Sequence, residues 1–461
     1  MYRRDFARFR AEIRDQKVAV LGIGVSNLPL LRFLLQMGAK VSAFDRREEA
    51  ELPEVVEEFK DSVALSLGPM YLRSLAQGSF DVIFRTPGLR PDVPELLAAQ
   101  AKGARITSEM EEFMRHCPAR IIGITGSDGK STTTTMIHGL LEAQGVNAWI
   151  GGNIGHPLFS EIESIAKEDV VVVELSSFQL MDMDVSADVA VVTNLSENHL
   201  DVHKDMQEYT EAKKNIFRFQ DAGARVILNK DNAITRSFAK EAVGEVSFFS
   251  SKGKAEAYYA DDVIYLGDVP VCRLSEMKVR GVHNAENFCA ALLATKDYVS
   301  IPTAHEYART FMGVRHRAQL VGQKRGVRYY NDSIASSPTR TLATVRSFQQ
   351  DRGRIIILLG GRDKKLDFQP LAEEAGSWFR HVILMGEAKE KIRRALLAYG
   401  GDAGEGLLEA EDMEEAVALA YKIARPGDVV LLSPGCTSFD RYRNFEERGD
   451  LFARLVGELP E

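Results

Sequence analysis

A glycine-rich segment at residues 125–131 (TGSDGKS) carries the residue types that bind the phosphates of a nucleotide. It follows an apolar run, 120–124, and precedes an expected helix, 131–144, so that unpaired backbone N–H groups and a positive helix dipole meet at the turn. Lys130 supplies a cation for the β- and γ-phosphates of ATP, and Ser131 supplies a hydroxyl for Mg²⁺. The alternative is a surface turn that happens to contain Gly-Lys-Ser, and the flanking strand and helix favour the nucleotide site.

The glycine spacing in this segment departs from the usual Gly-x-x-x-x-Gly-Lys-Ser pattern. That pattern would place a glycine at position 124, which is isoleucine, and the earlier glycine is Gly126 instead. We still expect the whole loop to bind ATP through the following residues: Gly126, Ser127, Asp128, Gly129, Lys130, Ser131 and Thr132.

Two further polar residues stand where apolar runs end. Glu174 ends the run 170–173, and His199 follows the run 190–194. Ligands of open α/β sheets bind beyond the carboxyl ends of the strands, so both side chains are expected near the phosphate loop. Together with Ser131 they offer oxygen and imidazole ligands for Mg²⁺. A capping glutamate and a loop histidine are the alternative, which the shared position at neighbouring strand ends disfavours.

The elements that must position these residues are strands and helices in alternation, which predicts an α/β fold class. The 461 residues are too many for one hydrophobic core, and a domain size of roughly 150 residues suggests three domains. We expect a Rossmann-like N-terminal domain at 1–117, a central P-loop-type mononucleotide-binding domain at 118–314 and a Rossmann-like C-terminal domain at 315–461. The expected strands are 17–21, 40–44, 81–84, 104–107, 120–124, 169–174, 187–194, 225–229, 354–359, 381–385 and 428–432.

The composition excludes several classes of protein. Hydrophobic residues make up 45% of the chain and charged residues 27%, the balance of an ordinary globular protein. A formal net charge of −8 argues against a nucleic-acid surface. The four cysteines are too scattered for a zinc site or a disulfide scaffold, and reduced thiols are expected. The apolar runs are strand-sized, so we expect a cytoplasmic protein that does not enter a membrane.

With several further motifs, these residues resemble the Mur ligase family of peptidoglycan synthesis, which also explains the position of Gly126. The central motifs are 125–131 (TGSDGKS), 152–155 (GNIG), 174–179 (ELSSFQ), 199–201 (HLD), 209–213 (YTEAK) and 281–287 (GVHNAEN). Three more segments resemble the family member that adds D-glutamate to UDP-N-acetylmuramoyl-L-alanine: 22–27 (GIGVSN), 331–336 (NDSIAS) and 433–449 (SPGCTSFDRYRNFEERG).

The resemblance implies an ATP-dependent ligase that joins these two substrates through an acyl phosphate. It implies that the UDP-sugar substrate is bound by Val25, Ser26, Asp45, Arg46, Gly88 and Asn153. It implies that ATP is also bound by Asn284, Arg317 and Asp332. It implies that D-glutamate is bound by Ser336, Lys364, Ser438, Phe439 and Phe445. Ile334 departs from the family pattern, because some members carry lysine at this position.

The resemblance also implies two Mg²⁺ ions, which Ser131, Glu174, His199 and Lys213 would hold. Spacing alone predicts that Lys213 is a solvated lysine on a helix surface, but the family carries a carbamylated lysine at this position. A neutral amine that adds CO₂ becomes an anionic oxygen ligand, and lysine loses its proton where its surroundings disfavour the charge. The catalytic residues expected from the resemblance are Lys130, His199 and Lys213.

We expect this ligase to be a monomer. Three other functions remain open. A ligase of the same superfamily could add another amino acid or extend folate, although folate ligases lack such an N-terminal unit. The pattern Gly22-x-Gly24-x-x-Asn27 would suit an NAD-dependent oxidoreductase, but the third glycine of that fingerprint is missing. A nucleotide-gated binding protein would bind ATP without turnover.

Overall fold

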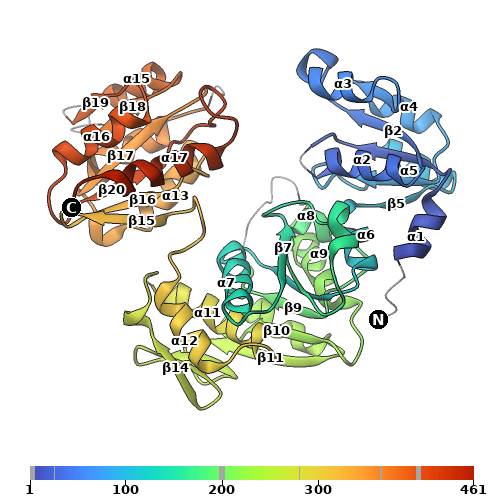
Figure 1. The fold of residues 1–461 in the computed structure, drawn as a ribbon, viewed down its shortest axis with the longest axis horizontal. Helices are drawn as coiled ribbons and strands as arrows, with labels where there is room; N and C mark the ends of the chain where they lie inside the picture. Colours follow the sequence, from blue (N-terminus) through green and yellow to red (C-terminus); the bar gives the residue numbers. More distant parts are fainter. Residues whose placement is uncertain (1–5, 25, 197–202, 280, 364–365, 401–405) are drawn as a thin grey trace. The chain divides into compact units, whose positions relative to one another are not determined.

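The computed structural model describes residues 6–24, 26–196, 203–279, 281–363, 366–400 and 406–461 (Figure 1). The chain forms two compact units, which divide between Thr310 and Phe311. The first unit holds two β-sheets and the second holds one. Three regions of mostly parallel sheet confirm the predicted three-domain α/β fold class, while the exact bounds 1–117, 118–314 and 315–461 stay a prediction. None of the described helices is long and apolar enough to cross a membrane.

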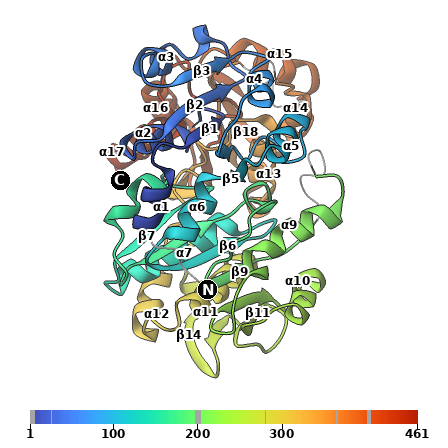
Figure 2. The ribbon, with the colours of Figure 1, turned by 90° about the vertical axis from the view of Figure 1, so that its right-hand side faces the viewer.

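The N-terminal sheet has five parallel strands in the order β3-β2-β1-β4-β5. Its strands are β1 (Lys17–Leu21), β2 (Lys40–Asp45), β3 (Ala64–Leu67), β4 (Val82–Arg85) and β5 (Arg105–Thr107). The helices of this region are α1 (Phe6–Ile13), α2 (Asn27–Gln36), α3 (Pro53–Phe59), α4 (Leu72–Gln77), α5 (Pro94–Ala101) and α6 (Glu109–His116). Successive side chains of a strand point to opposite faces, so Val18 and Val20 join the core under α2, whereas Ala19 and Leu21 join the core under α4 and α5 (Figure 2).

The central sheet has nine strands in the order β14-β13-β12-β11-β10-β9-β6-β8-β7. They are β6 (Arg120–Thr125), β7 (Ala148–Gly152), β8 (Val170–Glu174), β9 (Val189–Val192), β10 (Arg225–Asn229), β11 (Glu245–Ser250), β12 (Ala257–Ala260), β13 (Val263–Leu266) and β14 (Val269–Arg273). The helices are α7 (Lys130–Ala143), α8 (Ser177–Leu180), α9 (Met206–Arg218), α10 (Ala233–Ser237), α11 (Val282–Thr295) and α12 (Ile301–Thr310). The strands from β7 to β12 pair in parallel, and β13 and β14 extend the sheet as an antiparallel edge.

Aromatic side chains join the N-terminal region to the central sheet. Phe159 follows β7 and makes edge-to-face contacts with Phe9 and Phe33, with ring centroids 5.5 and 5.6 Å apart. These side chains belong to one continuous buried cluster that also includes residues of β8. Burial of this apolar surface explains why the first 310 residues form one compact unit.

The sheet of the second unit has the order β15-β16-β20-β17-β18-β19, and only the β15–β16 pair is antiparallel. Its strands are β15 (Gln319–Lys324), β16 (Val327–Asn331), β17 (Ile355–Gly360), β18 (Phe379–Met385), β19 (Leu407–Glu409) and β20 (Val429–Leu432). Its helices are α13 (Pro338–Arg346), α14 (Gln369–Trp378), α15 (Lys389–Tyr399), α16 (Met413–Ile423) and α17 (Phe445–Glu458). Ile355 and Ile357 pack under α13 to α15, whereas Ile356 and Leu358 pack under α16 and α17, so helices cover both faces.

Short 3₁₀ helices occur in both units. They are η1 (Glu49–Glu51), η2 (Phe159–Ser164), η3 (Phe238–Lys240), η4 (Leu274–Glu276) and η5 (Gln349–Asp351).

Candidate active site

The phosphate loop connects β6 to α7 in a form that only glycine allows at two positions. Gly126 has a φ of +148°, and a Cβ built there would lie 1.9 Å from Thr193 Oγ1. Gly129 has a φ of +79°, and its Cβ would lie 2.4 Å from Asn287 Oδ1. The off-pattern glycine of the sequence is therefore required by its close contact with the end of β9.

Hydrogen bonds hold this loop with its lysine in place. Asn194 accepts from Ser127 N at 2.9 Å through its backbone oxygen and from Asp128 N at 2.9 Å through Oδ1. Lys130 Nζ donates to Ser127 O at 2.8 Å, which keeps the ammonium group over the loop. Backbone groups and a cation are thus arranged before any anion binds.

Glu174 ends β8 beside the phosphate loop, as predicted. In the sheet register it lies opposite Ile124 of β6, and its side chain is 1% exposed. Asn153 Nδ2 donates to Glu174 Oε1 at 2.7 Å. The other carboxylate oxygen, Oε2, is buried and has no hydrogen-bond partner among the described residues. An orphaned, buried carboxylate oxygen is unusual unless a ligand or an ion completes it.

Lys213 is buried, not solvated as its spacing alone predicts. Its side chain is 1% exposed, and Nζ donates to Thr125 Oγ1 at 3.1 Å and to Gly126 O at 2.9 Å. Burial lowers the pKa of Lys213 well below its ordinary value, and the nearby charge of Lys130 lowers it further, against the opposite effect of Glu174. The correction has a tertiary cause, because α9 turns this residue toward the end of β6.

Sequence reasoning missed several residues that support this site. Asn287 of α11 lies against Gly129, and its Oδ1 accepts from Thr133 Oγ1 at 3.3 Å. His203 Nε2 is 2.8 Å from Ser177 Oγ, and its ring stacks on Phe178 with the centroids 5.2 Å apart. Asn287 lies within the 281–287 motif, but nothing in the sequence marked His203.

In the N-terminal region, Arg47 holds Asp45. The predicted substrate residue next to Asp45 is Arg46. Arg46 is exposed, whereas Arg47 donates to Asp45 Oδ1 and Oδ2 at 3.0 and 2.8 Å. Ile23 N also donates to Asp45 Oδ2, at 2.7 Å. Burial opposes ionisation of Asp45, but these hydrogen bonds outweigh it and lower the pKa. Asp45 thus fixes the turn after β1, and Ser26 directly precedes α2.

In the second unit, the predicted nucleotide residue Asp332 is buried and bonded on both oxygens. Its Oδ1 accepts from Ala318 N at 3.1 Å, and its Oδ2 accepts from Ser433 Oγ at 2.7 Å. Burial raises the pKa of Asp332 to about 6. Arg317 is exposed and lies between His316 and Ala318, which have positive φ values of 60° and 42°. Strained backbone of this kind concentrates at functional sites.

The predicted glutamate residues of the second unit lie on two neighbouring segments and on α17. Ser336 is half-buried just before α13, and Ser438 is buried. Phe439 is 53% exposed, and Phe445 is the first residue of α17. These segments leave the carboxyl ends of β16 and β20, which pair in parallel.

Some predicted residues lie outside the described residues or belong to different units. Val25, His199 and Lys364 lie outside the described residues. Asn284, in the first turn of α11, belongs to the first unit, whereas Arg317 and Asp332 belong to the second. A Cβ at Gly88 would meet no atom within 4 Å, so the space around it does not require glycine.

The described residues contain no group of three or more His, Cys, Asp or Glu side chains arranged to hold a metal ion. Whether the residues fit the predicted Mg²⁺ ion is therefore judged from Glu174. The free oxygen of Glu174 is a hard, anionic ligand of the kind that Mg²⁺ prefers, and this ion keeps waters and substrate phosphates as its other ligands. The residues present fit the ion.

Three α/β regions and a phosphate loop beside a buried lysine and carboxylate indicate a nucleotide-binding protein, and comparison with known families identifies its class. Residues 16–108 match the Mur ligase MurD-like N-terminal domain, 124–295 the Mur ligase middle domain and 316–436 the Mur ligase glutamate ligase domain. The chain belongs to the Mur ligase family. This assignment confirms the resemblance and leaves the NAD-dependent oxidoreductase without support.

Relatives of known name align over almost the whole chain. The UDP-N-acetylmuramoylalanine–D-glutamate ligases of Clostridium kluyveri and Clostridium beijerinckii are 50% and 51% identical over 462 residues, which cover 99% of this chain and all of each relative. Among solved structures, MurC from Thermotoga maritima has a TM-score of 0.55 at 17% identity and covers 96% of this chain and 98% of its own. MurF from Acinetobacter baumannii has a TM-score of 0.56 at 16% identity, covering 97% and 92%. At these identities the two structures support the fold alone.

Proposed function

We propose that the chain is an ATP-dependent ligase that joins D-glutamate to UDP-N-acetylmuramoyl-L-alanine in peptidoglycan precursor synthesis. The observation that carries the proposal is the full-length identity of about half to D-glutamate ligases. The central site supports it, because Lys130, Lys213 and Glu174 converge where phosphoryl transfer needs a cation and a metal ligand.

The chemical problem is that a carboxylate does not accept an amine at neutral pH. In the proposed reaction, an oxygen of the alanyl carboxylate bonds to the γ-phosphorus of ATP, and ADP leaves. The amine of D-glutamate then attacks the acyl carbon and loses a proton, and inorganic phosphate leaves as the amide forms. Lys130 is placed to stabilise charge on the transferring phosphoryl group, since its ammonium already lies over the loop.

Magnesium fits the same site as a proposed cofactor. Glu174 would hold it through the free Oε2, and Ser131, His199 and a carbamate on Lys213 are the other ligands that the resemblance implies. When bound, Mg²⁺ neutralises charge on the phosphates. Asn153 holds Glu174 Oε1, so the carboxylate keeps its orientation whether or not the ion is present.

Carbamylation of Lys213 is a second proposal for this site, in addition to the binding of Mg²⁺. The lowered pKa leaves the amine neutral more often than in water, and the neutral nitrogen can bond to the carbon of CO₂ with loss of one proton. The product is an anion near Lys130, and the ammonium group of Lys130 attracts it. Lys213→Ala should therefore lose turnover, and a small added carboxylate should partly restore it.

We propose that the other substrates bind the remaining regions as the resemblance implies. The UDP-sugar would bind at Ser26, Asp45, Arg46 and Gly88, and Asp45 is already fixed by Arg47 and Ile23. D-glutamate would bind at Ser336, Ser438, Phe439 and Phe445. ATP would also contact Asn284, Arg317 and Asp332. A monomer in the cytoplasm remains our expectation.

The experiment that tests this function supplies ATP, Mg²⁺ and UDP-N-acetylmuramoyl-L-alanine, and offers D-glutamate, L-glutamate, L-lysine or L-alanine in turn. Phosphate release should depend on D-glutamate. Release with L-lysine or L-alanine but not with D-glutamate would reject the assignment in favour of another ligase of the family. Lys214→Ala is the matched control for Lys213→Ala, because Lys214 is the next residue of α9 and pairs with Glu211 and Glu241 away from the phosphate loop.

A further inference from the structure

A buried arginine at the start of α17 has no role in the reaction described above. The side chain of Arg448 is 1% exposed, and within the described part of the chain it forms no ion pair with a carboxylate. Arg85 is buried to a similar degree, but its Nε lies 3.0 Å from Asp182 Oδ2. A buried guanidinium without a paired carboxylate is costly, because the charge loses its hydration. The buried charge of Arg448 therefore calls for a functional explanation.

Arg448 holds two segments of the second unit together. Its Nε donates to Ser333 Oγ at 3.0 Å, and its Nη2 donates to Ser333 O at 2.8 Å and to Cys436 O at 3.1 Å. Ser333 Oγ in turn donates to Phe445 O at 2.8 Å. One planar guanidinium thus links the segment after β16, the segment after β20 and the first turn of α17.

These three segments carry the glutamate residues that we predicted. Ser336 is three residues beyond Ser333, and Ser438 is two residues beyond Cys436. Phe445 lies one helical turn before Arg448 on α17. A displacement of the guanidinium would therefore displace residues on both sides of the proposed amino-acid subsite.

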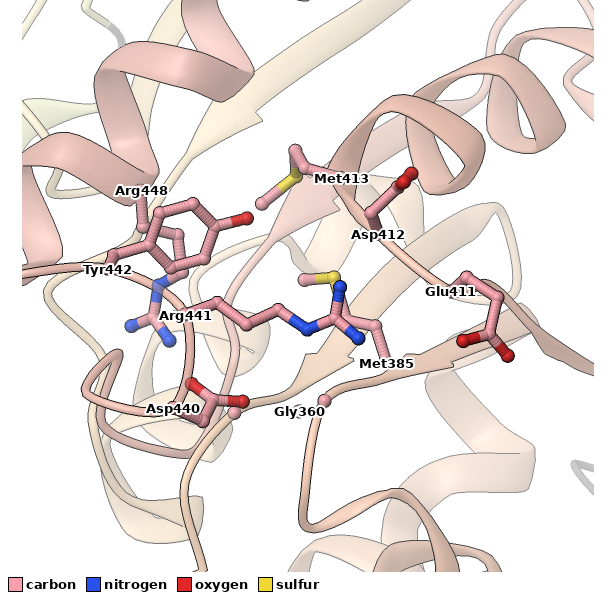
Figure 3. Close-up of a pocket in the computed structure, with 11 residues that line it drawn as sticks. Gly360, Met385, Glu411, Asp412, Met413, Asp440, Arg441, Tyr442 and Arg448 are labelled. Atoms are coloured by element: carbon pink, nitrogen blue, oxygen red, sulfur yellow. The ribbon is translucent and has the colours of Figure 1, made fainter.

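The third nitrogen of the guanidinium, Nη1, takes no part in these hydrogen bonds. Nη1 is buried and has no hydrogen-bond partner among the described residues. A Cβ at Gly361 would lie 3.1 Å from Nη1, so the glycine leaves space beside it. Arg448 also lines a pocket beyond the ends of β17 and β18, into which Asp440 and Arg441 project (Figure 3).

The charge of Arg448 persists at neutral pH. Burial lowers the pKa of Arg448 to about 10, against opposite effects of Cys436, Asp440 and Tyr442. The hydrogen bonds alone would not require a full charge, since all three acceptors are neutral oxygens. D-glutamate carries two carboxylates, so a fixed cation under its subsite has an electrostatic use.

We propose that Arg448 is a positioning residue of the glutamate subsite, which holds the segments 333–336 and 436–439 in register and places a fixed positive charge behind them. This inference rests on the proposed function. In this role Arg448 does not contact the reacting atoms. Its consequence is selective, because D-glutamate binding should depend on Arg448 while ATP and UDP-sugar binding should not.

The test compares KM values for all three substrates in the full-length enzyme. Arg448→Met should raise the KM for D-glutamate about tenfold or more, as expected for the loss of hydrogen bonds from a charged group. The KM values for ATP and the UDP-sugar should stay within about twofold. Arg448→Lys keeps the charge but loses the planar fork, and its KM for D-glutamate should lie between those of wild type and Arg448→Met.

Arg328→Met is the matched control. Arg328 is an ion-paired, half-buried arginine of the same sheet, 2.6 Å from Asp351, at the amino end of β16 and thus at the other end from the proposed subsite. It should lower stability without raising the KM for D-glutamate selectively. If Arg448→Met does not fold, Ser333→Ala removes one acceptor and should raise the same KM about threefold.

An unchanged KM for D-glutamate, or an equal rise in all three KM values, would overturn the inference. Failure of the proposed function would have a different result. In that case the wild-type enzyme would release no phosphate when D-glutamate is added. A wild-type enzyme that uses D-glutamate beside an Arg448→Met enzyme with unchanged KM values would reject only the positioning role.

Discussion

Replacing Lys213 with methionine should remove a pH dependence from the stability of the first unit. Lysine holds its proton in the unfolded chain up to a pH of about 10.4. In the folded protein, burial and Lys130 lower the pKa of Lys213 well below its ordinary value. Between these two pKa values the unfolded state binds more protons than the folded state, so stability rises with pH. Methionine has a similar length and carries no proton.

The size of this pH dependence follows from the binding of one proton by Lys213. Between the two pKa values, the free energy of unfolding rises by at most about 1.4 kcal/mol for each pH unit. The Lys213→Met enzyme should lack this increment. Other titrating groups are common to both proteins and cancel in the difference between them. Degassed buffers keep the amine free of CO₂, which would otherwise trap its neutral form.

The assay can observe the first unit alone, because the two tryptophans lie in different units. Trp149 is in β7 and Trp378 is in α14, so a Trp378→Phe background leaves Trp149 as the only tryptophan. Urea unfolding at pH 7, 8 and 9, followed by tryptophan fluorescence, then gives the stability of this unit. Parallel curves of stability against pH for the protein with Lys213 and for the Lys213→Met variant would refute a lowered lysine pKa.

The control for this assay is Lys214→Met. Nearby Glu211 and Glu241 raise the pKa of Lys214, against the effect of burial. A raised folded-state pKa contributes stability that is fully present below the unfolded value of about 10.4, so this contribution is constant from pH 7 to pH 9. The Lys214→Met protein should therefore keep the wild-type slope at a lower stability.

Three further predictions concern the phosphate loop, the metal ligand and the second unit. Glu174→Gln keeps the size of the side chain but not its charge, so Mg²⁺-dependent phosphate release should fall about 100-fold or more while the melting temperature changes little; near-normal release would exclude Glu174 as a ligand. Gly126→Ala should abolish ATP binding in calorimetry, because its Cβ would overlap Thr193 Oγ1; an unchanged affinity would show that the loop conformation is not required. Burial raises the pKa of Asp332 to about 6, so the folded state keeps a proton that the unfolded state loses and stability falls as the pH rises from about 4 to 6; Asp332→Asn should flatten this part of the curve when Trp378 fluorescence follows the second unit.

The strands that the sequence predicts best are those covered by helices on both faces. Residues 170–173 and 355–359 are buried without interruption, and such runs are visible in the sequence as continuous apolar stretches. The strands that it misses include edge strands such as β14 and β15, and also β11, β12, β13 and β16 inside their sheets. β14 exposes Val269 and Pro270, and no residue of β15 is fully buried, so neither strand contains an apolar run.

The candidate site was predictable where it depends on position along a strand. Lys130 and Glu174 follow from the rule that ligands bind at the carboxyl ends of parallel strands, and the structure places both there. Lys213 and Arg448 depend on which neighbours surround a helix, and charged residues at helical spacing give no sign of burial. Family resemblance supplied Lys213, and it also included Arg448 in the segment 433–449, but only the structure shows that Arg448 is buried.

In the proposed reaction, the γ-phosphoryl group of ATP passes to the alanyl carboxylate before the amide forms. The most direct measurement labels both oxygens of that carboxylate with ¹⁸O and follows the label during turnover with D-glutamate. Each phosphate released should carry one ¹⁸O, and the amide carbonyl should keep the other. Unlabelled phosphate, formed at the same rate as the amide, would contradict it.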